Sequence, residues 1–479
     1  MNLAVIRYIL SWILRFEAAF LLLPGLVGLI YGEDSAISYP ATALLCLAVS
    51  FIIAIRKPVV TELYAREGFL TVALSWIVMS AFGALPFVFS GEIPHYIDAL
   101  FEISSGLTTT GASILGDVGV LSHAGLFWRS FSHWIGGMGV FLFIMAITPL
   151  MGGPTMNLMR AESSGPAVGK LVPRVKDTAK ILYAIYIGFT ILEMVALLLC
   201  GLNLFDSMTL TFGTVGTGGF GIRNDSVAGF STAVQNVITV FMILSGINFA
   251  AYFCLLRRKW KDAVSIEEVR WYIGIILVSA LTITISIAPM YSSIGESMKH
   301  AFFQVGSIIT TTGYSTVNYE TWPMIAKNIL FTLMFVGACT GSTGGGIKIA
   351  RLLTLLKTIR KEISILAHPR LVRRIKIDDK TLPHQVLRSI NVYLALYCMI
   401  FFGSLLLISF DNKDFTTSFT AVAATLNNIG PGFSLVGPMG NFSDFSAFSK
   451  IILTFNMIAG RLELFPILLL FTPASWKKY

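Results

Sequence analysis

Four glycines occupy the same position in four similar stretches of this 479-residue sequence. Successive glycines lie 108, 94 and 117 residues apart, so a unit of about a hundred residues occurs four times, which predicts a repeat architecture. The stretches are ALFEISSGLTTTGAS, SMTLTFGTVGTGGFG, AFFQVGSIITTTGYS and SFTAVAATLNNIGPG, and their glycines are Gly111, Gly219, Gly313 and Gly430.

The residue types around each glycine suit the coordination of a cation by oxygen atoms. Each stretch is a short apolar segment followed by polar residues and then the glycine. Glycine tolerates positive φ without a Cβ penalty, so it suits a strained loop that presents carbonyl groups. A short helix before such a loop points the negative end of its dipole at whatever lies beyond its last residue. Four such loops around one axis would form a ring of oxygens, the design of a cation selectivity filter.

Close packing is the alternative interpretation of these glycines, because glycine-rich stretches in membrane helices also let helices approach one another. A single stretch would favour packing. Four stretches in register, each lying between longer apolar segments, favour the filter.

The composition indicates a polytopic membrane protein. The chain is 55% hydrophobic and only 13% charged, and its mean hydropathy is +0.76. Segments without transmembrane character are short, so we expect no sizeable soluble domain. The five cysteines show neither metal-ligand nor disulfide spacing.

The glycine stretches must be positioned by longer apolar segments. A membrane span needs about 20 mainly apolar residues, whereas the segment before each glycine has about a dozen, so we expect half-helices that enter and leave on the same side. The fold class is therefore an all-α polytopic membrane protein, with four pseudo-symmetric span–re-entrant loop–span units around one pore and an N-terminal pair of spans. The predicted spans are 5–31, 40–56, 69–90, 126–149, 181–202, 234–256, 271–290, 325–350, 386–410 and 448–472. The corresponding boundaries are 1–62 for the N-terminal pair, and 63–178, 179–268, 269–384 and 385–479 for pore units 1 to 4.

The distribution of Lys and Arg predicts the orientation. Basic residues gather in 56–57, 160–180, 256–261 and 351–388, whereas loops such as GEDSAISYP carry acids instead. Because positive loops stay in the cytoplasm, we expect both termini to be cytoplasmic and the four re-entrant stretches to enter from outside.

A second polar feature interrupts the last part of unit 3, where the other units keep more continuous hydrophobicity. Irregular backbone at membrane depth is tolerated only where protein or a water-filled cavity satisfies it. A flexible loop just below a filter could gate the pore; a packing kink is the alternative. The residues of this predicted gating loop are Gly341, Ser342, Thr343, Gly344, Gly345 and Gly346.

Charged residues near the predicted pore give three further expectations. Arg461 lies within the last span, and Glu463, two residues away, would lie on a different helix face, so we expect Arg461 to point at the pore. A structural arginine that ties this span to a neighbouring one is the alternative. Asp98 and Asp206 precede half-helices and are expected to be N-caps. The GxGxxG match at 216–221 lacks a preceding strand, and no catalytic set stands out, so we expect no enzyme activity.

Together these features resemble the Trk/Ktr/HKT superfamily of potassium transporters. The N-terminal pair, the interrupted span and AGRLELFP around Arg461 favour its bacterial TrkH/TrkG branch. The resemblance implies a K⁺-translocating subunit of the bacterial inner membrane, with K⁺ as the transported ion and no organic cofactor. It also implies a homodimer whose cytoplasmic face binds RCK-type (TrkA-like) nucleotide-binding regulatory subunits. The filter oxygens that it implies belong to Thr109, Thr110, Gly111, Thr217, Gly218, Gly219, Thr311, Thr312, Gly313, Asn428, Ile429 and Gly430.

Two other functions stay open at this point. The last glycine stretch departs from the other three, because Asn427, Asn428 and Pro431 replace hydroxyls and a small or aromatic residue, so a Na⁺-permeable or Na⁺-coupled symporter is one alternative. A membrane anchor for a cytoplasmic regulator is the other, supported by the basic 351–388 segment. An anchor would not need four glycines in register, and fluxes of K⁺, Rb⁺ and Na⁺ separate the two transport functions.

Overall fold

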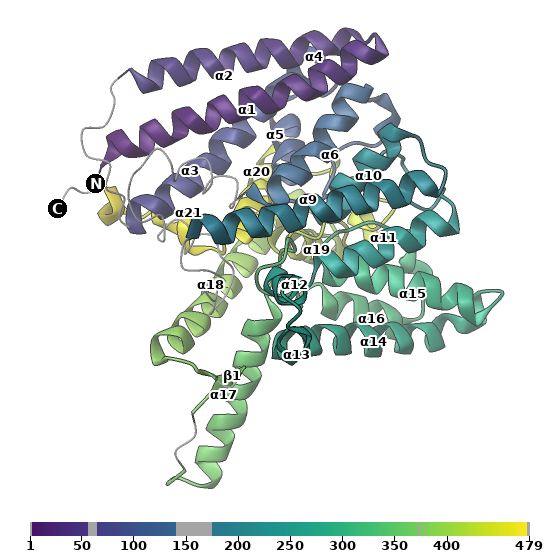
Figure 1. Ribbon diagram of the computed structural model, residues 1–479, viewed down its shortest axis with the longest axis vertical. Helices are drawn as coiled ribbons and strands as arrows, with labels where there is room; N and C mark the ends of the chain where they lie inside the picture. The colour runs from purple at the N-terminus through teal and green to yellow at the C-terminus, as the bar shows by residue number, and fades with distance from the viewer. Residues whose placement is uncertain (1, 56–64, 140–174, 372–373, 379, 477–479) are drawn as a thin grey trace.

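The structure of the chain is a computed structural model that describes residues 2–55, 65–139, 175–371, 374–378 and 380–476 (Figure 1). Within these residues, six helices are long and apolar enough to cross a membrane, or seven if one bent pair counts as a span. The chain is therefore a multi-pass, mainly helical membrane protein, as its composition predicts. A two-stranded antiparallel hairpin, β1 (Lys376–Ile377) and β2 (Lys380–Thr381), lies outside the helical body.

The N-terminal pair of helices, α1 (Leu3–Tyr31) and α2 (Ser38–Ala54), lie side by side at one edge of the molecule (Figure 1). Gly32 ends α1 in the left-handed conformation, at φ 69°. The next residue, Glu33, accepts the backbone N–H groups of His123 at 2.7 Å and Ala124 at 3.1 Å. Because these groups belong to the first turn of a helix in unit 1, Glu33 fixes the pair to that unit.

Each of the four units has a first helix, a short helix and a second helix, in the predicted order. The first helices are α3 (Ala65–Gly83) with α4 (Leu85–Ser90), α9 (Val175–Leu199), α14 (Glu267–Ile287) and α18 (His384–Ile408). The short helices are α5 (Tyr96–Leu107), α10 (Leu204–Val215), α15 (Ile294–Ile309) and α19 (Phe415–Leu426). The second helices are α6 (His123–Gly137), α11 (Thr232–Ser245) followed by α12 (Phe249–Leu256), α16 (Met324–Leu333) followed by α17 (Ile349–Ala367), and α20 (Ala447–Arg461) followed by α21 (Phe465–Leu470).

Short connecting helices complete the described chain. They are α13 (Trp260–Ser265) and the single-turn 3₁₀ helices η1 (Asp34–Ile37), η2 (Val118–Val120), η3 (Ala288–Met290), η4 (Tyr319–Thr321), η5 (Ser409–Asp411), η6 (Ser434–Val436) and η7 (Pro473–Trp476). The predicted span 126–149 and the basic segment 160–180 lie partly outside the described residues.

The expectation that unit 3 alone has an interrupted second span is wrong. In unit 2, α11 and α12 meet at an angle of 93°. In unit 4, α20 ends at Arg461, and Glu463 and Leu464 have positive φ of 60° and 69° before α21 begins. Hydropathy did not reveal these breaks because the segments on both sides of each are largely apolar, while backbone turns and caps decide where a helix stops.

The four units are arranged in a ring in chain order. The second helix of one unit packs against the short helix of the next, as α6 does with α10, α11 with α15 and α20 with α5. Between units 3 and 4, Phe331 of α16 packs against Phe419 of α19, with ring centroids 5.8 Å apart. The contact between α20 and α5 joins the last unit to the first and closes the ring.

The helix α17 projects from this body together with the β-hairpin (Figure 1). At its side, Lys357 donates to Glu267 of α14 at 2.6 Å and to the carbonyl oxygen of Lys376 at 2.8 Å. These contacts attach both the projecting helix and the hairpin to unit 3.

The expected N-caps are wrong, and one of the two aspartates has a different role. His95 and Asn203 are the N-cap residues of α5 and α10, and the side chain of Asn203 accepts the N–H of Asp206. Asp98 instead accepts from Lys450 Nζ of α20 at 2.7 Å. This ion pair lies where the ring closes between units 4 and 1.

Replacing Lys450 by Met tests this closure contact, since the variant keeps the apolar stem and loses the charge. The Lys450 side chain is only 8% exposed. We therefore expect a destabilisation of about 1–3 kcal/mol, typical of a hydrogen bond to a charged group. Thermal unfolding of the detergent-purified protein measures it. The control is Lys259→Met, because Lys259 and Asp262 are 3.9 Å apart and 63% exposed, and such pairs contribute less than about 1 kcal/mol. Equal midpoints for the two variants would contradict the role of Lys450.

Candidate functional site: the ring of four glycine loops

One backbone turn follows each short helix, in the segments 108–111, 216–219, 310–313 and 427–430, which we name loops 1 to 4. In each, the residue two positions before the glycine has left-handed φ, and the next N–H bonds to the carbonyl five residues earlier. This is the Schellman motif, which ends a helix and turns the chain away. The left-handed residues are Thr109 (φ 55°), Thr217 (55°), Thr311 (59°) and Asn428 (55°), and the glycines Gly111, Gly219, Gly313 and Gly430 have φ of 78°, 79°, 86° and 93°.

The glycine of each loop lies against a carbonyl oxygen of the next loop. A Cβ added to any of the four would lie less than 3.0 Å from that oxygen. The pairs are Gly111 with Gly218, Gly219 with Thr312, Gly313 with Ile429, and Gly430 with Thr110. The four loops thus form a closed ring, and glycine is required in each by both its positive φ and the lack of space.

Most polar side chains of loops 1, 3 and 4 form hydrogen bonds inside the protein. Hydroxyls bond to each other in two loops, Thr108 to Thr110 at 2.7 Å and Thr310 to Thr312 at 2.8 Å. Loop 4 uses amides: Asn427 donates to Tyr397 at 2.8 Å, and Asn428 donates to Thr110 at 2.9 Å and to the carbonyl of Met457 at 2.8 Å. Asn428 therefore ties loop 4 to loop 1. The sequence indicated the glycines but not the left-handed threonines, because β-branched residues rarely adopt that conformation.

A buried ion pair supports loops 1 and 2 from behind. Arg129 of α6 donates to Glu102 of α5 at 2.7 Å, and their side chains are 2% and 0% exposed. Glu102 also accepts the N–H of Ile114 just beyond loop 1, and Arg129 donates to the carbonyl of Gly221 just beyond loop 2. Sequence reasoning missed this pair; the signal was one acid and one arginine within apolar segments.

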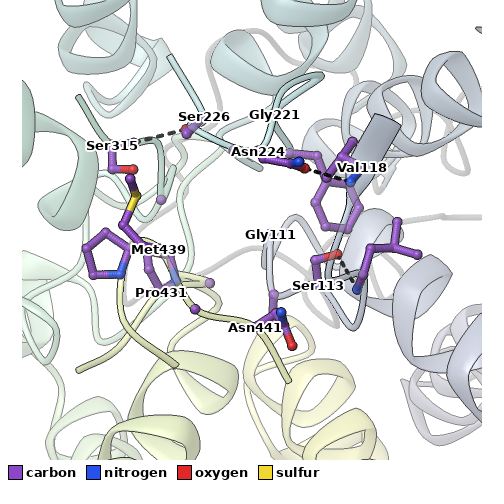
Figure 2. Close-up of a pocket in the computed structure, with 18 of the residues that line it drawn as sticks. Gly111, Ser113, Val118, Gly221, Asn224, Ser226, Ser315, Pro431, Met439 and Asn441 are labelled. Carbon is purple, nitrogen blue, oxygen red and sulfur yellow. Dashed lines mark hydrogen bonds between the residues drawn. The ribbon is translucent and has the colours of Figure 1, made fainter. Parts of the chain in front are cut away.

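The ring opens into a cavity of about 160 Å³ that all four loop glycines line (Figure 2). Outer segments of different units are linked around it, since Ser315 N–H donates to Ser226 and Val118 N–H donates to Asn224. Nearby, hydrogen bonds from the Asn224 side chain and the Gly119 backbone hold the pKa of Asp117 below its ordinary value. Within the described residues no group of three or more His, Cys, Asp and Glu could hold a metal ion. The oxygens available at the ring are therefore backbone carbonyls, hydroxyls and amides.

The predicted gating loop lies directly against the ring. The Gly345 N–H donates to Thr311 Oγ1 at 2.6 Å, and this hydrogen bond joins the predicted gating loop to loop 3 of the ring. A Cβ on Gly344 would lie less than 3.0 Å from the carbonyl oxygen of Thr310, and a Cβ on Gly345 equally close to that of Asn427. The glycines of this segment are needed for its close approach to loops 3 and 4.

Charged side chains hold the predicted gating loop in place. Glu268 accepts the backbone N–H groups of Thr340 and Ala350, at 2.6 and 3.1 Å, and so binds the chain on both sides of the loop. Lys348 donates to the carbonyl of Gly344 within the loop. Buried cations and anions thus replace the backbone partners that a continuous helix would supply.

Arg461 belongs to the same set of contacts. Its guanidinium donates to the carbonyl of Thr343 at 2.8 Å and to that of Gly136, at the end of α6, at 2.5 Å. The nearby carboxylate of Glu463 forms an ion pair with Arg351 of α17. Arg461 therefore connects unit 4 to the predicted gating loop and to unit 1, as expected of the structural alternative.

Replacing Gly219 by Ala tests the close approach in the ring. The methyl group would displace the carbonyl of Thr312 and impose strain of roughly 1–2 kcal/mol from the left-handed conformation alone. We expect a lower thermal midpoint and a lower yield of monodisperse protein. The control is Gly403→Ala in α18, where a Cβ meets nothing within 4 Å. If the two variants unfold at the same temperature, the loops do not pack as described.

Comparisons with known proteins agree with this architecture. The TrkH family, described as a cation transport protein, matches residues 41–478. The Trk system potassium uptake protein TrkH of Escherichia coli (strain K12) is 38% identical over 490 residues, covering 100% of both chains. TrkG of the same organism is 32% identical and covers 99% of both. The crystal structure of the potassium transporter TrkH from Vibrio parahaemolyticus superposes with a TM-score of 0.89 at 33% identity, over 100% of each chain. The chain belongs to the TrkH family of cation transport proteins.

Proposed function

We propose that this chain is the K⁺-translocating subunit of a Trk-type K⁺ uptake system and moves K⁺ through the ring of loops 1 to 4. The closed ring is the observation that carries the proposal, because its four glycines each face a carbonyl oxygen of the next loop. Relatives that match over the full length are potassium uptake proteins, and they support K⁺ as the transported ion. Translocation needs no bond to be made or broken, so the proposal assigns no catalytic residue.

In this proposal the filter oxygens come from the residues that the resemblance implied. The three residues of each loop are Thr109, Thr110 and Gly111; Thr217, Gly218 and Gly219; Thr311, Thr312 and Gly313; and Asn428, Ile429 and Gly430. Each short helix ends four residues before its glycine, so the negative end of its dipole favours a cation beyond it. Carbonyl oxygens held in a ring replace the hydration shell of the ion.

Replacing Gly313 by Ser tests the filter. The added Cβ would lie against the carbonyl oxygen of Ile429 and 2.9 Å from Pro431 Cδ, and so changes the geometry of loops 3 and 4 together. We expect K⁺ uptake to fall by about tenfold, or the K⁺ to Na⁺ flux ratio to fall similarly. Uptake of K⁺, Rb⁺ and Na⁺ in cells lacking their own K⁺ uptake systems measures both.

The matched control is Gly274→Ser, at a helical glycine where a Cβ meets nothing within 4 Å. It should transport like the original chain. If the original chain carries Na⁺ as readily as K⁺, the Na⁺-permeable alternative replaces K⁺ uptake. Normal fluxes in Gly111, Gly219 and Gly313 variants alike would remove the filter assignment.

The residues Gly341 to Gly346 and Arg461 form the gate in this proposal. The loop contacts Thr311 and Asn427 of the ring. The side chains of Glu268, Lys348 and Arg461 hold it there. It therefore lies where it can obstruct an ion that leaves the ring. A rearrangement that breaks these few hydrogen bonds would move the loop without unfolding a helix.

Replacing Arg461 by Ala removes the donors to Thr343 and Gly136, so the gating loop should spend more time displaced. We expect basal K⁺ flux per molecule to rise by roughly fivefold, the effect of losing a hydrogen bond of about 1 kcal/mol. Flux and monodisperse yield are measured on the same preparation. Arg270→Ala, at an exposed arginine of α14, is the control. Unchanged flux per molecule with reduced yield would give Arg461 a structural role alone.

The proposal also includes the cellular setting. A homodimer in the bacterial inner membrane, with both termini cytoplasmic, would place the projecting helix α17 on the cytoplasmic side, where its basic residues agree with the positive-inside rule. That helix and the β-hairpin would be accessible to an RCK-type (TrkA-like) nucleotide-binding subunit. The boundaries 1–62 for the N-terminal pair and 63–178, 179–268, 269–384 and 385–479 for the four units belong to the same proposal.

A further inference from the structure

Loop 2 lacks the side chains that support loops 1 and 3. In loops 1 and 3, the first and third residues are threonines that are hydrogen-bonded to each other, Thr108 with Thr110 and Thr310 with Thr312. At the same two positions, loop 2 has Gly216 and Gly218. Gly218 does not have positive φ, so backbone conformation does not explain the absence of a side chain there. A glycine with ordinary φ inside a well-packed ring indicates that another group occupies the space of its side chain.

The imidazole of His133 occupies that space. A Cβ on Gly218 would lie less than 3.0 Å from three atoms of the ring, Nδ1, Cγ and Cε1. The carbonyl oxygen of His133 similarly lies within 3.0 Å of the Cβ position of Gly216. His133 comes from α6 of unit 1, so the support of loop 2 is supplied by the preceding unit in the ring.

His133 is held rigidly in this position. Its side chain is fully buried and stacks on the ring of Phe220, the residue after Gly219, with centroids 4.4 Å apart. The guanidinium of Arg129, one helical turn earlier, lies 4.0 Å from the centroid of the same Phe220 ring. Two α6 side chains therefore hold the residues before and after Gly219.

We propose that His133 is a positioning residue of the ion pathway, which sets the geometry of loop 2 in place of the missing threonine pair and so contributes to ion selectivity. This inference rests on the proposed K⁺ transport. The contact is one of shape, because neither ring nitrogen has a hydrogen-bond partner among the described residues. The position eleven residues after the helix N-cap is His133 in unit 1 and methionine in the others, at Met242, Met334 and Met457.

A reciprocal exchange of side chains tests the proposal. His133→Ala empties the space behind Gly218, and we expect the K⁺ to Na⁺ uptake ratio to fall by roughly threefold or more, as for other contacting pairs. Gly218→Thr alone should also lower it, since the threonine meets the imidazole. The double variant His133→Ala with Gly218→Thr should recover a ratio closer to the original, because loop 2 then has a threonine where loops 1 and 3 have one.

Ratios are measured with the full chain in cells lacking their own K⁺ uptake systems, alongside monodisperse yield. His133→Met, the residue type of the other units, should keep most of the selectivity, and Met79→Ala, a buried control in α3, should leave it unchanged. An unaltered ratio in His133→Ala, or a double variant worse than both single variants, would overturn the inference. Absence of K⁺ uptake by the original chain would instead contradict the proposed function, so the two failures are distinguishable.

Discussion

The close approach between each loop glycine and the carbonyl of the next loop is the constraint on which the rest of the structure depends. No loop has room for a Cβ at this point, so none of the four can move without displacing a neighbour. Left-handed threonines before the glycines add strain of about 1–2 kcal/mol each, and such strain persists only when the surroundings fix it. Hydrogen-bonded hydroxyls, the Glu102–Arg129 pair and the packing of each second helix on the next short helix supply that support.

The broken helices of units 2 and 3 depend on each other. The N–H of Phe249, at the start of α12, donates to the carbonyl of Gly341, and the N–H of Cys339 donates to the carbonyl of Gly246. Each break therefore satisfies backbone groups that the other exposes, which is what allows irregular chain at membrane depth. The segment Gly341–Gly346 is thus part of an interface between two units, and its contact with Thr311 links it to the ring.

The ring combines a common backbone with different side-chain support in each loop. The Schellman turn and the positive-φ glycine are the same in all four. Loops 1 and 3 are supported by threonine pairs, loop 4 by Asn427 and Asn428, and loop 2 by an imidazole from the neighbouring unit. Backbone geometry alone determines where the carbonyls lie, so side chains could diverge between units wherever another group filled the same space.

The sequence by itself determined the class of protein, the four units, the half-helices and the positions of the four glycines, because these follow from local composition, length and spacing. It also located the irregular segment at Gly341–Gly346. Only the tertiary structure decided the breaks at Gly246 and after Arg461, the left-handed Thr109, Thr217 and Thr311, and the partners of Glu102, Asp98 and His133. Those features depend on groups that are distant along the chain, 27 residues away for Glu102 and Arg129 and 352 for Asp98 and Lys450. The sequence pattern of one chain does not indicate which distant residue packs into a given space.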